Sequence, residues 1–249
     1  MLRFVCFWLL VLPLENHAQD TRTLLNQAGQ LEKLCRESDA LLVYGEVIRI
    51  QPTNITALCR CSELSCLIGN RQSARTSQTV YFEAARTYAE AALRINPQVS
   101  ESNFVMAFAL GRLCLISSGR ERIRLAQGIK RYTDLAIAED PRNFKAYHLL
   151  GKWNYEVSNL NFMERTLARW MYGALPPASL QSAIAAYEKC LQLSPEFLLN
   201  YLELARAYDR NGQRRKAQAL LSQMLRLPNA SPDDNRIKSL GKELLLQWQ

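Results

Sequence analysis

Residues 183–205 read AIAAYEKCLQLSPEFLLNYLELA, and this stretch decides the fold. Small and apolar residues recur in its first half at the spacing of one helix face, and this half closes on Pro195. Proline cannot continue a helix and restrains the residue before it, so Pro195 marks a helix end. In the second half, Tyr201 and Leu204 precede the small residue Ala205. The stretch therefore predicts two consecutive helices. The small residue lets helices approach closely, and the aromatic side chain fills the remaining space.

The same pattern recurs along the chain. Four residues repeat the offsets of the first stripe and its proline: Ala40, Tyr44, Val47 and Pro52. Five prolines end predicted helices: Pro52, Pro97, Pro141, Pro195 and Pro228. This pattern resembles the tetratricopeptide repeat, a helix–turn–helix unit of about 34 residues. The resemblance predicts an all-α fold, a right-handed α-solenoid of helix pairs. We expect one repeat domain over 19–249, with repeats at about 21–52, 54–97, 101–141, 143–195 and 198–228 and a capping helix at 232–247.

The fourth repeat is longer than the others. Tyr147 and Ala183 are 36 residues apart, whereas the matching residues Tyr201 and Ala217 are 16 apart. The added segment has helical spacing of apolar residues over about 161–172, and we expect an inserted helix that packs on the repeat stack. At the other end, the run 231–234 has Ser as a helix N-cap, Pro in the first turn and two acids, which predicts the start of the capping helix.

The insert and the tail carry a more specific resemblance. The stretches His148–Ser158, Leu160–Arg165 and Tyr172–Ala178, with the tail Leu227–Asp234, resemble the C-terminal half of the regulator of microtubule dynamics family. The resemblance covers roughly 140–245 and becomes generic repeat character before 80. It implies a helical repeat fold without enzymatic activity. Animal members are linked to microtubules or to contacts at organelle membranes.

The first residues have the pattern of a secretory signal peptide. Arg3 precedes the apolar run 4–12, and the small residue Ala18 lies before the predicted cleavage point. The run is too short for an ordinary membrane span, which needs about 20 apolar residues. We therefore expect residues 1–18 to be removed and the mature chain to be exported, periplasmic or secreted, without a membrane span. The alternative is an uncleaved amphipathic or buried segment. The leader makes the chain resemble an exported bacterial relative of the family.

Composition narrows the classes of function. Apolar residues make up 48% of the 249 residues, charged residues 22%, and glycine plus proline only 19 residues, which excludes collagenous and largely disordered chains. Two histidines exclude a histidine-rich metal site and argue against acid–base catalysis. Six cysteines follow the leader: Cys35, Cys59, Cys61, Cys66, Cys114 and Cys190. Cys59 and Cys66 would lie about 10 Å apart along one helix, too far for a disulfide, so we expect small buried core residues.

Three cations define the candidate binding surface. Arg112, Lys152 and Arg206 each follow the small residue of a first helix, and such helices line the concave face of a repeat array. Neighbours one turn away or in the middle repeat extend this expected column: Phe108, Leu202, Lys145, His148 and Tyr155. A row of cations with apolar neighbours suits a carboxylate, a phosphorylated group or a lipid headgroup. The alternative is a solvated basic face without a ligand, as we expect for the clusters 120–124 and 214–216.

The sequence thus predicts a non-catalytic scaffold that binds a partner protein or an extended acidic peptide in its concave groove. We expect no catalytic residue, metal, cofactor or nucleic-acid partner; His148, alone after the leader, fits a packed or groove-lining residue better than a catalyst. One alternative is a carrier of a lipid or other anionic ligand, in a cavity that the inserted helix closes. Another is a structural assembly factor that uses its convex face.

Overall fold

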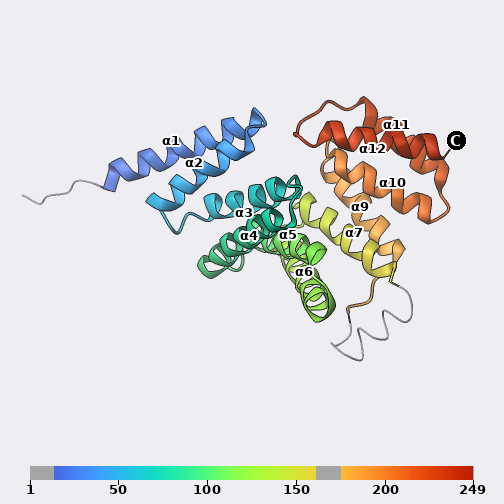
Figure 1. Cartoon of the computed structure of the whole chain (residues 1–249), viewed down its shortest axis with the longest axis horizontal. Helices are drawn as coiled ribbons and strands as arrows, with labels where there is room; N and C mark the ends of the chain where they lie inside the picture. The colour runs from blue at the N-terminus through green and yellow to red at the C-terminus, as the bar shows by residue number, and fades with distance from the viewer. Residues whose placement is uncertain (1–13, 161–174, 249) are drawn as a thin grey trace, which may run out of the picture.

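The computed structural model describes residues 14–160 and 175–248. Within these ranges the regular structure consists of helices alone, which confirms the all-α solenoid (Figure 1). The helices are α1 (Leu14–Lys33), α2 (Glu37–Ile50), α3 (Ile55–Asn70), α4 (Arg75–Ile95), α5 (Ser100–Ile116), α6 (Gly119–Glu139), α7 (Phe144–Ser158), α9 (Leu180–Leu193), α10 (Leu198–Arg210), α11 (Arg214–Arg226) and α12 (Asp234–Gln247).

Consecutive helices pack as pairs, and the pairs stack into a curved array. The pairs are α1/α2, α3/α4, α5/α6, α7/α9 and α10/α11, and α12 packs on the last pair. In Figure 1 the array runs from α1 (blue) to α10–α12 (orange to red), and it bends so that the α1–α2 turn faces the loop before α12. The predicted inserted helix at 161–172 lies outside the described residues, as do residues 1–13 of the expected leader. Helix α1 begins at Leu14 and therefore runs through the predicted cleavage point after Ala18.

Side-chain caps fix the starts of α3 and α7. Asn54 and Asn143 accept hydrogen bonds from the backbone N–H groups of Ala57 and Ala146, at 3.0 and 3.1 Å. The capping helix departs from the prediction, because Ser231 does not cap it. Instead the Asp234 carboxylate accepts the backbone N–H groups of Ala230 and Ser231, at 2.7 and 2.8 Å, and so fixes the loop that leads into α12.

Small residues bring paired helices together, as expected. A Cβ atom added at Gly151 would lie 2.5 Å from the Tyr187 ring, so this glycine permits the close approach of α7 and α9. Gly151 is the eighth residue of α7, and the eighth residue of α5 is the fully buried Ala107. Gly111, predicted to be the equivalent residue, lies one turn later, and an added Cβ there would meet only Leu149, at 3.9 Å. The expected register of α5 was therefore one turn off.

The expectation that the six cysteines are buried core residues is confirmed for four of them and is wrong for Cys35. Cys59, Cys61, Cys66 and Cys190 are buried, whereas Cys35 is exposed and Cys114 is half-buried. Burial raises the pKa of each of the four core thiols to about 12, so they are protonated at neutral pH. Among the described residues, no helix is both long enough and apolar enough to cross a membrane.

Candidate functional site: the surface of the inner helices

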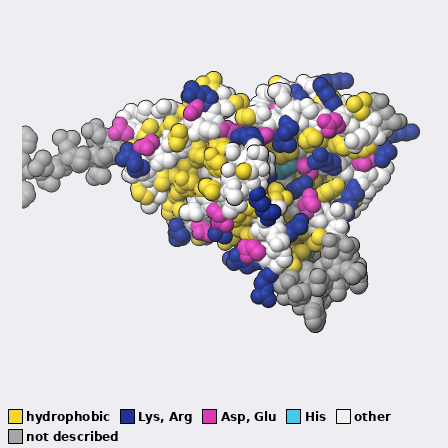
Figure 2. All heavy atoms as spheres, in the orientation of Figure 1, with side chains coloured by type: hydrophobic (Ala, Val, Ile, Leu, Met, Phe, Trp, Pro, Cys, Tyr) yellow, Lys and Arg dark blue, Asp and Glu magenta, His cyan; other side chains and the backbone are white. Residues whose placement is uncertain are grey.

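The first helices of successive pairs lie on the inner side of the array. We call α3, α5, α7 and α10 the inner helices, because α3 contacts α5, α5 contacts α7 and α7 contacts α10. Comparable packing between consecutive second helices is not found in the described part of the chain, so those helices diverge on the outer side. Figure 2 shows a hollow in the middle of this side, where the histidine (cyan) is surrounded by basic and acidic side chains.

A cluster of charges around Glu63 joins three inner helices. The Lys145 ammonium of α7 lies 2.8 Å from the Glu63 carboxylate of α3 and 3.7 Å from the Glu101 carboxylate of α5. Arg60, one turn before Glu63, pairs with Glu63 and with Glu32 of α1. Burial alone would raise the pKa of Glu63, but Lys145 and Arg60 hold it below its ordinary value. The carboxylate is therefore ionised and neutralises much of the Lys145 charge.

A second cluster surrounds Glu203 of α10. Its carboxylate accepts from Lys152 of α7 and from Arg206 of its own helix, each at 3.0 Å. Lys152 also reaches Glu156, at 3.0 Å. Burial opposes ionisation of Glu203, but Lys152 and Arg206 outweigh it and keep its pKa below the ordinary value. Two of the three cations in the expected column are thus compensated by a buried acid.

His148 has a structural position between these clusters. The Asn200 amide nitrogen donates to the Tyr187 carbonyl at 2.9 Å, so its oxygen faces His148 and accepts from Nδ1 at 3.1 Å. The imidazole also packs against the rings of Tyr187 and Phe197, with centroids 5.6 and 5.0 Å away. Burial lowers the pKa of His148, which favours the neutral ring. These contacts make His148 a packed residue that helps to hold α7 against α10.

Arg112 differs from the other cations of the column. Its Nη1 donates to the Asn70 side-chain oxygen at 2.9 Å, and its guanidinium lies 4.8 Å from the centroid of the Phe108 ring. Its Nε is buried without a hydrogen-bond partner, and no carboxylate of the described residues lies within ion-pair distance. Burial lowers the pKa of Arg112, and the nearby Cys66 and Asp233 oppose that effect. A half-buried charge without a carboxylate partner is costly, which makes Arg112 the strongest candidate for contact with an anion.

Counting residues from the start of each inner helix shows which side chains occupy equivalent positions in the column. The ninth residues of α7 and α10 are Lys152 and Arg206, whereas the ninth residues of α3 and α5 are Glu63 and Phe108. Arg112 lies one turn beyond this position. The structure therefore gives a mixed acidic, aromatic and basic row where the sequence predicted three equivalent cations. Glu63 and Glu203 were missed. Glu63 has the same helix position as Lys152 and Arg206, whereas nothing in the sequence marks Glu203 as buried.

The remaining expected residues are divided between surface and core. Phe108 stacks on Phe104 with centroids 5.7 Å apart, and Tyr155 lies under the Arg210 guanidinium, 5.0 Å from the ring centroid. Both are half-buried. Leu202, expected to line the groove, is only 1% exposed and belongs to the core of the last repeat.

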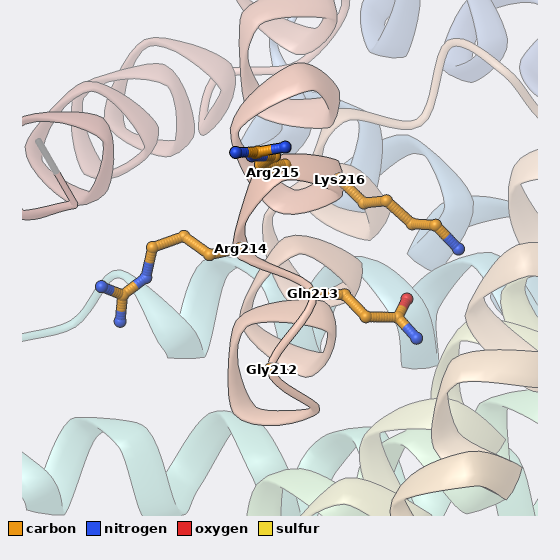
Figure 3. Close-up of a pocket in the computed structure, with 5 residues that line it drawn as sticks. All are labelled: Gly212, Gln213, Arg214, Arg215 and Lys216. Atoms are coloured by element: carbon orange, nitrogen blue, oxygen red, sulfur yellow. The ribbon is translucent and has the colours of Figure 1, made fainter.

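The basic cluster 214–216 forms a shallow hollow of about 380 Å³ at the start of α11. Figure 3 shows that its side chains diverge: Arg214 points to one side, and Gln213 and Lys216 point to the other. Arg214 is paired with Asp209 at 2.7 Å, and Lys216 lies 5.5 Å from the Tyr208 ring centroid. Diverging cations do not converge on one ligand. This hollow is therefore a weaker candidate site than the inner helices.

The described residues contain no group of three or more His, Cys, Asp or Glu side chains that could hold a metal ion. The thiols near the inner helices are protonated, and His148 uses its Nδ1 to contact Asn200. What the arrangement provides is a fixed set of charged and aromatic groups, which is a chemistry of recognition.

Comparison with known proteins agrees with this architecture. A structure of a thermophilic TPR protein from Thermus thermophilus superposes with a TM-score of 0.67, covering 91% of this chain and 99% of that one; at 18% identity this shows the fold alone. Regulator of microtubule dynamics protein 3 of Bos taurus is 27% identical over 91% of this chain and 49% of its own length. Regulator of microtubule dynamics protein 1 of Caenorhabditis elegans is 25% identical over 76% of this chain and 81% of its own length.

The chain thus spans about half the length of the bovine relative it matches, and its similarity to a Xenopus laevis protein 3 covers 34% of that protein at 31% identity. The family described as Regulator of microtubule dynamics protein 1-3 matches residues 24–249, almost all of the chain. The match extends well before residue 80, where the sequence showed only generic repeat character. The chain belongs to the regulator of microtubule dynamics family.

Proposed function

We propose that this chain is a non-catalytic scaffold that holds a segment of a partner protein along its inner helices. One observation carries the proposal: two charged clusters, centred on Glu63 and Glu203, fix half-exposed cations on one surface, with Phe108 and Arg112 between them. Ion pairs already hold these side chains in place, so a bound segment would order few additional groups. Such pre-organisation favours binding to an extended, polar segment.

The ion pairs bear on where an acidic partner would bind. Lys145, Lys152 and Arg206 are committed to internal carboxylates, so an acidic partner gains least by competing for them. Arg112 has no such carboxylate, and we place the acidic contact there. The lipid-carrier alternative depends on a helix over 161–172, which is outside the described residues, and no observation favours it over the scaffold.

Site-specific photocrosslinking tests the scaffold proposal. A photoreactive phenylalanine analogue is placed at Phe108 or Tyr155 on the inner helices, and at Leu42, an exposed residue of the outer helix α2, as a matched control. In the native host, the inner positions should give discrete protein adducts that mass spectrometry identifies, and the control position should not. Adducts only at Leu42 would support the convex-face alternative. Lipid adducts alone at the inner positions would support the carrier, and either result would overturn our proposal.

A further inference from the structure

The two ends of the array are joined by an ion-pair network. Arg71, directly after α3, donates from Nη1 to the Asp233 carboxylate at 3.1 Å and from Nη2 to the Glu37 carboxylate at the start of α2. Nearby, the Cys35 sulfur lies 3.9 Å from the Ala230 carbonyl oxygen. We call Glu37, Arg71 and Asp233 the clasp. It connects residues 162 positions apart and brings the second repeat to the loop before the capping helix.

The clasp is held by charge rather than by apolar packing. Within the described part of the chain, helices α1–α3 make no extensive packing contact with helices α10–α12. The clasp side chains are partly buried, with exposures of 29% for Arg71, 12% for Glu37 and 17% for Asp233. A contact of this kind can open without disrupting either core, and salt should weaken it.

Arg112 lies beside the clasp. Its guanidinium is bonded to Asn70, the residue before Arg71, and the Asp233 charge is close enough to oppose the effect of burial on the Arg112 pKa. Asp233 also approaches Arg236 at 3.6 Å. The Asp233 carboxylate is therefore shared between Arg71 and Arg236, while Arg112 has no carboxylate within ion-pair distance in the described structure.

We propose that Arg71 and Arg112 form a binding site for an acidic segment of a partner protein, and that Asp233 occupies part of this site intramolecularly when the array is closed. The inference rests on the scaffold function and identifies the chemistry of its partner. A partner carboxylate that replaces Asp233 at Arg71 and also reaches Arg112 gains two charge-assisted contacts. Asp233 makes the contact with Arg71 but not the one with Arg112. Binding and opening of the clasp are then coupled, because both use Arg71.

Closure is tested without a ligand by a disulfide between Cys35 and an introduced cysteine. In Ala230→Cys, mild oxidation should join residues 35 and 230, seen as a mobility shift on a non-reducing gel. The disulfide should form more slowly at high salt and in the double variant Ala230→Cys/Asp233→Asn. The variants Cys35→Ser/Ala230→Cys, without the first thiol, and Ala230→Cys/Asp209→Asn, with a matched charge change outside the clasp, are controls. A shift that is insensitive to salt and to Asp233→Asn would contradict a charge-held clasp.

The binding site is tested with a fluorescent hexaglutamate peptide. Asp233→Asn should raise the affinity of the full chain for this probe by about fivefold or more, because the internal competitor is removed, and Asp209→Asn should not. Adding Arg112→Gln to Asp233→Asn should lower the affinity about tenfold. Arg49→Gln, which removes an exposed charge on α2, is the matched control, and circular dichroism verifies that each variant is folded.

The outcomes separate this site from the scaffold function. Equal affinities in Asp233→Asn and Asp209→Asn, or no effect of Arg112→Gln in a folded variant, would overturn the site. Partner adducts at Phe108 and Tyr155 would still support the scaffold. Sedimentation of the chain with phosphatidylglycerol vesicles but not phosphatidylcholine vesicles, lost in Arg112→Gln and without peptide binding, would also reject the acidic protein segment in favour of a membrane surface.

Discussion

The Lys145 ammonium of α7 lies 2.8 Å from the Glu63 carboxylate of α3, so one ion pair spans the intervening α5 repeat. Glu63 is 10% exposed and Lys145 27%, which places the pair between the surface and the core. Both residues have a further partner, because Glu63 also pairs with Arg60 and Lys145 also approaches Glu101. This cluster therefore helps to fix the curvature of the array.

Lys145→Met should lower the free energy of unfolding by about 1–3 kcal/mol. The substitution leaves Glu63 with Arg60 alone, and a buried carboxylate that loses a partner is costly, though partial exposure reduces the effect. Urea unfolding measures the change. Lys189→Met, on the exposed side of α9, is the matched control and should shift stability by less than about 0.5 kcal/mol. Equal losses in the two variants would show that the ion pair has no special role.

Two glycine substitutions test the register of the inner helices. Gly151→Ala should destabilise the chain by about 1–3 kcal/mol, because the new Cβ would lie 2.5–2.8 Å from the Tyr187 ring. Gly111→Ala should be neutral or stabilising by up to about 1 kcal/mol, because its Cβ has ordinary contact with Leu149 and alanine favours the helix. Thermal unfolding followed by circular dichroism compares them. A larger loss at Gly111 would support the register expected from the sequence.

Acid should destabilise the chain through its buried glutamates. The pKa of Glu203 is held below its ordinary value, so the unfolded chain takes up the proton first as pH falls. The stability contributed by Glu203 is present above about pH 4.5 and is lost as pH falls through the lower folded pKa. Glu203→Gln should therefore be less stable at neutral pH but lose less stability on acidification. Urea midpoints between about pH 6 and pH 3 measure this, with Glu46→Gln as the exposed control.

Five of the seven cysteines should fall into two classes of reactivity. Cys35 is exposed, whereas burial raises the pKa of Cys59, Cys61, Cys66 and Cys190 to about 12. The thiolate is the reactive form, so a thiol reagent should label Cys35 quickly and the four core thiols only after unfolding. Mass spectrometry of the labelled peptides locates the sites, and Cys35→Ser should remove this fast site. Rapid labelling of the core thiols in the native chain would contradict the packing described here.

Much of the fold was readable because it is local. Apolar residues at helical spacing and the prolines after α2, α4, α6 and α9 identify each helix pair with residues close in sequence. The register of α5 was ambiguous because two small residues, Ala107 and Gly111, lie one turn apart on the same helix. The offset from the preceding proline decides between them, because Ala107 follows Pro97 by ten residues as Gly151 follows Pro141, and the helix start at Ser100 agrees.

The site was less readable because its contacts are distant. The sequence placed Lys145, Lys152 and Arg206 on the inner helices, but it did not show that buried acids compensate them. Glu63 and Lys145 are 82 residues apart, and such a pairing depends on how three repeats stack. Arg71 was not a candidate, because it lies in the turn between α3 and α4, away from every repeat position that we considered.

The clasp also gives the array a different folding topology. In an open repeat array, each unit contacts only its neighbours, so terminal repeats can fray independently of the rest. Here the link between Arg71 and Asp233 turns a linear sequence of units into a loop, with the second repeat touching the segment before the cap. Asp233 lies at the start of α12, so release of the whole C-terminal helix from the array would have to break that link. The last repeat is therefore protected against local unfolding in part by Arg71, which lies 162 positions before Asp233 in the sequence.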